Sequence, residues 1–340
     1  MRGLILIQID GLAGSVLRRA MKENRMPFIS EMSKSKDRRL WTFYSGIPSN
    51  TPSVQGEIFY GIRQCVPAFQ FRDRRTRKKM TMYECGNAQE IEERLQKQGA
   101  ALLSEGSSYG NIFTGGAKRF AFCITALQFS ADFFKFSVMR FARFLVLNPF
   151  FCAKTILQMA GEVLIGVKDV LSGVLRGEHV TQELYFVFTR VIGSIFLRNW
   201  ITVSTVIDMR EKLPVIHLNY FGYDEQAHRR GPTSEFALWS LKGIDDAVKT
   251  VCRAAEKLKR RYPYDVWIYS DHGQEESRPY SSVIGNDIKC IIENYFRATE
   301  YKHGRHQGRQ DVSLNEWQKL YAERLAKSGK SGSIPPVNEE

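Results

Sequence analysis

The sequence has no long apolar run that is free of charge. In its most hydrophobic region, residues 120–204, charged side chains recur too often to leave the roughly 18 uncharged residues that a membrane-spanning helix needs. At the N-terminus one Arg precedes a short apolar run, without a cleavage-like site, which predicts a first strand rather than a signal peptide.

The cysteines also lack a pattern. The chain has 6 of them, scattered and without a C-x-x-C pair, which favours free thiols in a reducing compartment. We therefore predict a cytoplasmic protein, with membrane association left open. The net charge of +13 indicates an anionic partner such as a phosphate-bearing substrate or a membrane surface. Because the sequence has no zinc finger and no aromatic–basic module, we expect no specific nucleic-acid partner.

Strand-like and helix-like segments alternate in two separate parts of the chain, residues 1–119 and 205–297. This alternation predicts an α/β fold, with a mainly parallel sheet flanked by helices and one core formed by both parts. Between the two parts, the Phe-rich residues 120–204 predict an inserted helical region. Residues 298–340 are polar and basic, and we expect this tail to be partly disordered.

Two interpretations of the Phe-rich region stay open. Its helices would pack on the core or on a second subunit, which would make the protein a homo-oligomer. Alternatively, the interspersed Arg and Lys residues would hold a basic amphipathic hairpin on an anionic membrane, as a peripheral contact through residues 120–204.

Three expected strands end in Asp, or in Asp with His. Asp10 follows the apolar run GLILIQI, Asp224 and His228 follow VIHLNYF, and Asp271 and His272 follow VWIYS. Each group alone also fits a turn or a helix cap. However, ligands of open α/β sheets bind beyond the carboxyl ends of the strands, and three coincidences at such positions are hard to explain as turns. Carboxylate oxygens and imidazole nitrogens are ligands of catalytic zinc, so this pattern predicts a metal site.

The motifs QIDG, GYDEQAH (a D-x-x-x-H) and SDHG, in this order, resemble the type I phosphodiesterase/nucleotide pyrophosphatase family of the alkaline phosphatase superfamily. The resemblance covers about residues 1–62 and 205–285. It implies hydrolysis of phosphate esters, at a phosphodiester or nucleotide pyrophosphate bond, with two divalent metal ions for which zinc is the first choice. The basic loop Arg72–Met80, together with Arg63, would attract the anionic substrate.

The resemblance also implies a metal-bound Ser or Thr nucleophile at the start of a helix. Thr51, in SNTPSVQGEIFYG, lies ten residues before Gly61, a spacing similar to that of the family. Pro52 follows Thr51 directly, whereas many members have this proline one residue later, so Ser49 and Ser53 stay as competitors. Alternatively, Thr51 is an ordinary N-cap with Pro52 at the first helical position, a role that is compatible with that of a nucleophile.

Carried over residue by residue, the resemblance implies two metal sites. The first would be formed by Asp10, Thr51, Asp271 and His272. The second would hold Asp224, His228 and a third ligand, a His that lies far downstream in the family. Here only His303 and His306 follow the SDHG motif, in a basic, Gly-punctuated segment.

We therefore expect the chain to stop before the C-terminal part of the family, with the second metal site incomplete. The alternative function is then a catalytically weak or inactive family member that acts as a membrane-peripheral or scaffolding protein.

Overall fold

The structure is a computed structural model that describes residues 2–127, 195–277 and 288–303, and short stretches between 139 and 163. The chain divides into two compact units, Met1–Glu276 and Ser277–Glu340. In the second unit the described helix is α12 (Ile288–His303). Most of the predicted insertion (120–204) and of the predicted tail (298–340) lies outside the described residues, so the predicted domain boundaries stay predictions.

A five-stranded sheet forms the centre of the first unit, with every strand parallel to its neighbours. Its spatial order is β5 (Arg119–Ala121), β4 (Ser107–Tyr109), β6 (Val215–Tyr220), β1 (Gly3–Ile9) and β7 (Tyr264–Tyr269). The α/β fold with a mainly parallel sheet is therefore confirmed.

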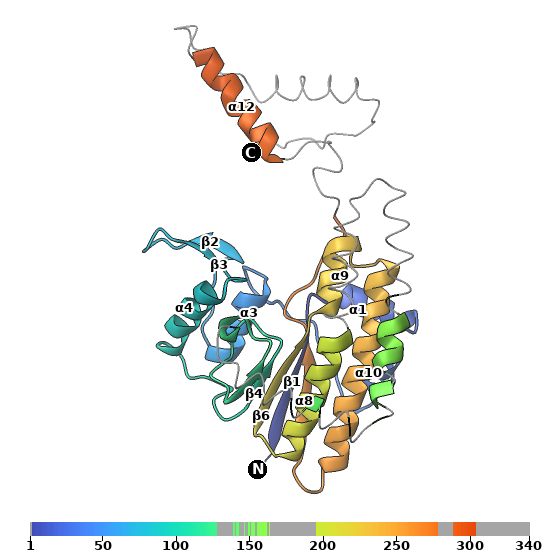
Figure 1. Ribbon diagram of the computed structural model, residues 1–340. Coiled ribbons are helices and arrows are strands. Elements are labelled where there is room, and N and C mark those ends of the chain that lie inside the picture. The colour runs from blue at the N-terminus through green and yellow to red at the C-terminus, as the bar shows by residue number, and fades with distance from the viewer. Residues whose placement is uncertain are drawn as a thin grey trace. The chain divides into compact units, whose positions relative to one another are not determined.

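Helices cover both faces of this sheet (Figure 1). One face carries α1 (Gly14–Lys22), α2 (Pro27–Ser33), α8 (Arg198–Arg210), α9 (Gly222–Arg230) and α10 (Glu235–Leu258). The other face carries α3 (Thr51–Tyr60), α4 (Cys85–Gln96) and the 3₁₀ turn η1 (Ile124–Ala126). A separate antiparallel hairpin is formed by β2 (Gln70–Arg72) and β3 (Lys79–Thr81).

Strand β1 shows why the first residues read as an uninterrupted apolar run. Ile5, Ile7 and Ile9 belong to the core on the α10 side of the sheet, whereas Leu4 packs against the core on the α3 side. A strand of a parallel sheet that is buried on both faces needs apolar residues at successive positions instead of alternate ones.

The long helix α10 begins at a side-chain N-cap and buries an apolar stripe along its length. Its N-cap is Ser234, whose hydroxyl accepts a hydrogen bond from the main-chain N–H of Ala237 at 3.3 Å. Its apolar stripe, which includes Leu241 and Val248, is fully buried against the sheet. Among the described residues, no helix combines the length and the apolarity required to cross a bilayer.

Candidate active site

Asp10 lies where strand β1 ends, between β6 and the edge strand β7. Gly11 then turns the chain with a φ of +67°, a backbone conformation that favours glycine. A Cβ added at Gly11 would lie 2.0 Å from Oδ1 of Asp224, so the turn also leaves room for this carboxylate. The Asp-Gly pair thus both forms a turn and brings two acidic side chains together.

Asp271 and His272 follow the end of β7, the neighbour of β1, and reach the same place. The Nε2 atom of His272 lies 3.4 Å from Oδ1 of Asp10 and 3.6 Å from Oδ2 of Asp271. Oδ1 of Asp271 accepts a hydrogen bond of 3.3 Å from the main-chain N–H of Gly11. Asp10, Asp271 and His272 therefore converge at one point, as they must if they share a metal ion.

Thr51 is the first residue of helix α3, and its side chain faces Asp10 and His272. Its hydroxyl donates to Oδ1 of Asp10 at 3.2 Å and lies 3.3 Å from Nε2 of His272. Ser49, a competitor for the role of nucleophile, instead pairs its hydroxyl with that of Ser45 at 2.7 Å.

The alternative interpretation of Thr51 as the N-cap of this helix is wrong. The N-cap is Asn50, whose Oδ1 accepts a hydrogen bond of 3.0 Å from the main-chain N–H of Ser53. Both Asn and Thr are capping residues, and Pro is compatible with the first turn in either register. Because Asn50 provides the cap, the hydroxyl of Thr51 is free to point to the acidic cluster. The helix ends at Gly61, which has a φ of +71°.

Asp224 and His228 come from α9, which begins directly after β6. They are one helical turn apart, with Nε2 of His228 3.3 Å from Oδ2 of Asp224. The hydrogen bond to Asp224 raises the pKa of His228, which favours a protonated, ion-paired imidazole. Gln274 holds the other side of Asp224, because its amide donates to Oδ1 and to the main-chain oxygen of Asp224.

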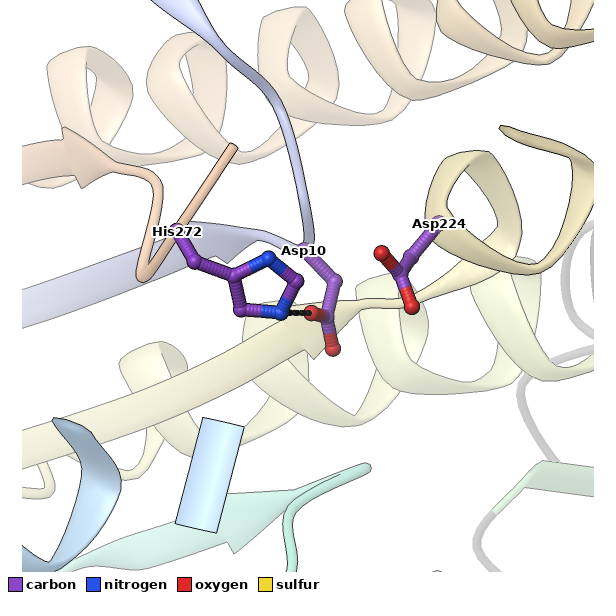
Figure 2. A group of neighbouring side chains, drawn as sticks. All are labelled: Asp10, Asp224 and His272. Atoms are coloured by element: carbon purple, nitrogen blue, oxygen red, sulfur yellow. Dashed lines mark ion pairs between the residues drawn. The ribbon is translucent and has the colours of Figure 1, made fainter. Parts of the chain in front are cut away.

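Three side chains from different elements offer ligand atoms to one ion. Atoms of Asp10, Asp224 and His272 all lie within 4.8 Å of one another, and the three side chains point to a common space (Figure 2). This group combines residues that the sequence assigns to two separate metal sites. Of the expected third ligands, His303 is the last residue of α12 in the second unit, and His306 lies outside the described residues.

The electrostatics of this cluster fit a cation. Burial raises the pKa of Asp10 well above its usual range, and repulsion from Asp271 and Asp224 raises it further. Burial also raises the pKa of Asp271 to about 6. Oδ2 of Asp271 is fully buried, and no described residue donates a hydrogen bond to it. Three carboxylates lie close together, and one of their buried oxygens accepts no hydrogen bond from the described part of the chain. Such a group of oxygen ligands suits a divalent cation.

Sequence reasoning missed the side chain that orients Asp10. Asn219, on β6, is buried and donates from Nδ2 to Oδ2 of Asp10 at 2.8 Å. Such outer hydrogen bonds fix the direction of metal-ligating carboxylates. A signal was present, because Asn219 and His217 are polar residues inside an expected buried strand.

A buried amide contact, also missed, links the helix of Thr51 to the strand of Asp10. Gln55, one turn after Thr51, donates to Oε1 of Gln8 at 3.1 Å, and its own Oε1 accepts a 2.8 Å bond from the N–H of Ile112. Both glutamines are fully buried. This contact sets the position of α3 on the sheet and therefore the distance from Thr51 to Asp10.

Comparison with known proteins now identifies the family. The family model described as type I phosphodiesterase / nucleotide pyrophosphatase matches residues 151–327, about half of the chain. The chain belongs to this family. The family named by the resemblance is thereby confirmed, although the match contains GYDEQAH and SDHG but not QIDG and extends into the Phe-rich region. The matched residues include Asp224, His228, Asp271 and His272, whereas Asp10 and Thr51 precede the match.

The type I phosphodiesterase family is hydrolytic and generally depends on divalent metal ions, so a phosphodiesterase-like hydrolase is supported at this coarse level. Neither the curated proteins nor the solved structures provide a significant match to this chain.

Proposed function

We propose that this family member hydrolyses phosphate esters, at a phosphodiester or nucleotide pyrophosphate bond, with Thr51 as the nucleophile. The observation that carries the proposal is the position of the Thr51 hydroxyl, 3.2 Å from Asp10 and 3.3 Å from His272 at the start of α3. The start of a helix favours a bound phosphate, because its main-chain N–H groups and its dipole are positive.

We assign the metal-binding roles to described residues at the ends of three strands. Asp10, Asp271 and His272 would hold one divalent metal beside Thr51. Asp224, which also faces Asp10 and His272, would hold a second metal with His228, and zinc is the first candidate for both. When bound, such metals neutralise phosphate charge and lower the pKa of a nearby hydroxyl. His228 must lose the proton that Asp224 favours before its nitrogen can bind a metal, so the second metal should bind more weakly at low pH.

In the reaction, Oγ1 of Thr51 attacks phosphorus while the bond from phosphorus to the leaving oxygen breaks. Water then cleaves the bond from phosphorus to Oγ1 of Thr51, releases the remaining phosphate monoester and restores the hydroxyl. Asp10 accepts the hydrogen bond of the Thr51 hydroxyl and so directs it before attack. The buried contact from Gln55 to Gln8 keeps α3 in place while the substrate enters.

Three alanine variants test the nucleophile. Thr51→Ala should reduce hydrolysis of bis(p-nitrophenyl) phosphate by at least about a thousandfold, because the other groups only position and stabilise. The content of bound metal, measured by elemental analysis of protein purified without chelator, should stay close to that of the wild type. Ser49→Ala and Ser53→Ala are matched controls and should keep most of the activity. Loss of activity in either control, with Thr51→Ala near normal, would refute this assignment.

The alternative function is supported by the second metal site, for which two protein ligands are proposed. Two ligands bind zinc less firmly than three, so the protein would carry about one tightly bound metal and hydrolyse weakly. A catalytically weak or inactive protein with a membrane-peripheral or scaffolding role would show no gain of activity with excess zinc. The predicted cytoplasmic location and the predicted membrane or subunit contact through residues 120–204 remain proposals, and that region lies mostly outside the described residues.

A further inference from the structure

Residues 40–47, which we call the aromatic loop, connect α2 to the segment before α3 and expose every large apolar side chain that they contain. All are more than half exposed, with Trp41 at 73% and Tyr44 at 76%: Leu40, Trp41, Phe43, Tyr44 and Ile47. Scattered exposed apolar residues are normal on protein surfaces, whereas so many within one short loop are typical of an interaction site.

Cations precede the aromatic loop directly. Four exposed basic residues occur within six positions, with a single carboxylate, Asp37, among them: Lys34, Lys36, Arg38 and Arg39. The surface is therefore apolar and positively charged together. The net charge of +13 has the same sign, so the whole chain favours an anionic partner at this surface.

The aromatic loop borders the candidate active site. It ends four residues before Thr51, and a Cβ added at Gly14, the first residue of α1, would lie 3.9 Å from Oγ1 of Thr42. Helices α1 and α3 both begin at the carboxyl edge of the sheet, where Asp10 lies. A partner held by the loop would therefore lie beside the cluster of Asp10, Asp224 and His272.

The aromatic residues of the loop, together with the cations before it, favour a lipid surface as the partner. Trp and Tyr concentrate at the boundary between lipid and water, where the ring is buried and the polar atom stays hydrated. Neighbouring Lys and Arg side chains add attraction to anionic headgroups. A peripheral surface needs both contributions, since either alone binds only marginally.

We propose that the aromatic loop, with the cations of residues 34–39, docks the protein on an anionic lipid bilayer. Trp41, Phe43 and Tyr44 enter the headgroup boundary, while Arg38 and Arg39 contact lipid phosphates. This surface is separate from the Phe-rich residues 120–204, and docking does not depend on catalysis. If the proposed hydrolysis is correct, the surface holds the nucleophile next to phosphate esters at a bilayer.

Co-sedimentation of the full chain with vesicles tests the docking surface. Wild-type protein should bind vesicles of phosphatidylcholine with 30% phosphatidylglycerol, with little binding to phosphatidylcholine alone and weaker binding at high salt. Arg38→Glu with Arg39→Glu should weaken binding at least about tenfold, because each cation near such a surface contributes roughly a fivefold gain. The triple variant Trp41→Ala, Phe43→Ala, Tyr44→Ala should weaken binding by a similar factor.

Matched controls separate docking from general damage. Trp267 on β7 is 67% exposed, similar to Trp41, so Trp267→Ala should bind vesicles as the wild type does while Trp41→Ala binds more weakly. Lipids with brominated chains should quench tryptophan fluorescence in the wild type, and Trp41→Phe should lose most of this quenching. Thr51→Ala should bind vesicles normally, so a failure of the proposed nucleophile leaves this result intact.

The proposal is overturned if wild-type protein does not bind anionic vesicles. It is equally overturned if the loop variants bind within about twofold of the wild type. Analytical ultracentrifugation without lipid provides the remaining outcome. A wild-type dimer that the loop variants convert to monomer, with vesicle binding unchanged, would show that the loop contacts a second copy of the chain instead.

Discussion

Replacement of Asn219 by Leu removes one hydrogen bond from the candidate metal centre and keeps the number and branching of the heavy atoms in the side chain. Nδ2 of Asn219 donates at 2.8 Å to Oδ2 of Asp10, and the residue is 2% exposed. After the change, water cannot readily replace the lost donor, and Asp10 can rotate away from Thr51 and His272. Loss of such an outer hydrogen bond usually costs a factor of about 10 to 100 in metal affinity.

The measurement is a competition titration with a zinc chelator, on wild-type and Asn219→Leu protein. Asn87→Leu is the control, because Asn87 is also buried and donates to a carboxylate, that of Glu84, on α4. Asn219→Leu should lose about 1 to 3 kcal/mol of unfolding free energy, as expected when a buried acceptor loses its donor, and Asn87→Leu should lose less, because the carboxylate of Glu84 is exposed to water. Only Asn219→Leu should lose metal affinity. Zinc affinity within twofold of the wild type would refute the role of Asn219 in orienting Asp10.

Two further predictions concern the metal and the pH. Removal of metal by a chelator should lower Tm, because the buried carboxylates then repel one another. In Asp271→Asn, which has one carboxylate fewer, the fall in Tm should be smaller. An equal fall in Tm in the two proteins would count against a metal at this cluster. His217 is fully buried, and burial lowers its pKa from 6.5 to about 3. As the pH falls, the imidazole of His217 binds a proton at a higher pH in the unfolded chain than in the folded chain. The free energy of unfolding should therefore fall by about 2 kcal/mol between pH 7 and pH 5. Urea unfolding of His217→Gln should lack this part of the fall, and an identical pH dependence would show that His217 is not its source.

The amino-acid sequence by itself determined the parallel sheet and the placement of acidic and imidazole side chains at the strand ends. Apolar runs such as that of β1 indicate strands buried on both faces, and Asp10, Asp224 and Asp271 follow three of them. Because the carboxyl ends of parallel strands meet at one edge, these residues could be assigned to a common region without knowing the strand order.

Only the tertiary structure decided which of these residues are neighbours. The order β6, β1, β7 brings Asp224 within reach of both Asp10 and His272, so the cluster crosses the two sites that the sequence kept apart. The sequence does not show whether Asn50 or Thr51 is the N-cap of α3, because both residue types cap helices. The choice depends on which of the two side chains faces the acidic cluster. Asn219 and Gln55 act through contacts with strand β1, more than 40 residues away in the sequence. Such contacts leave no periodic signal in the sequence, because they depend on how separate elements pack.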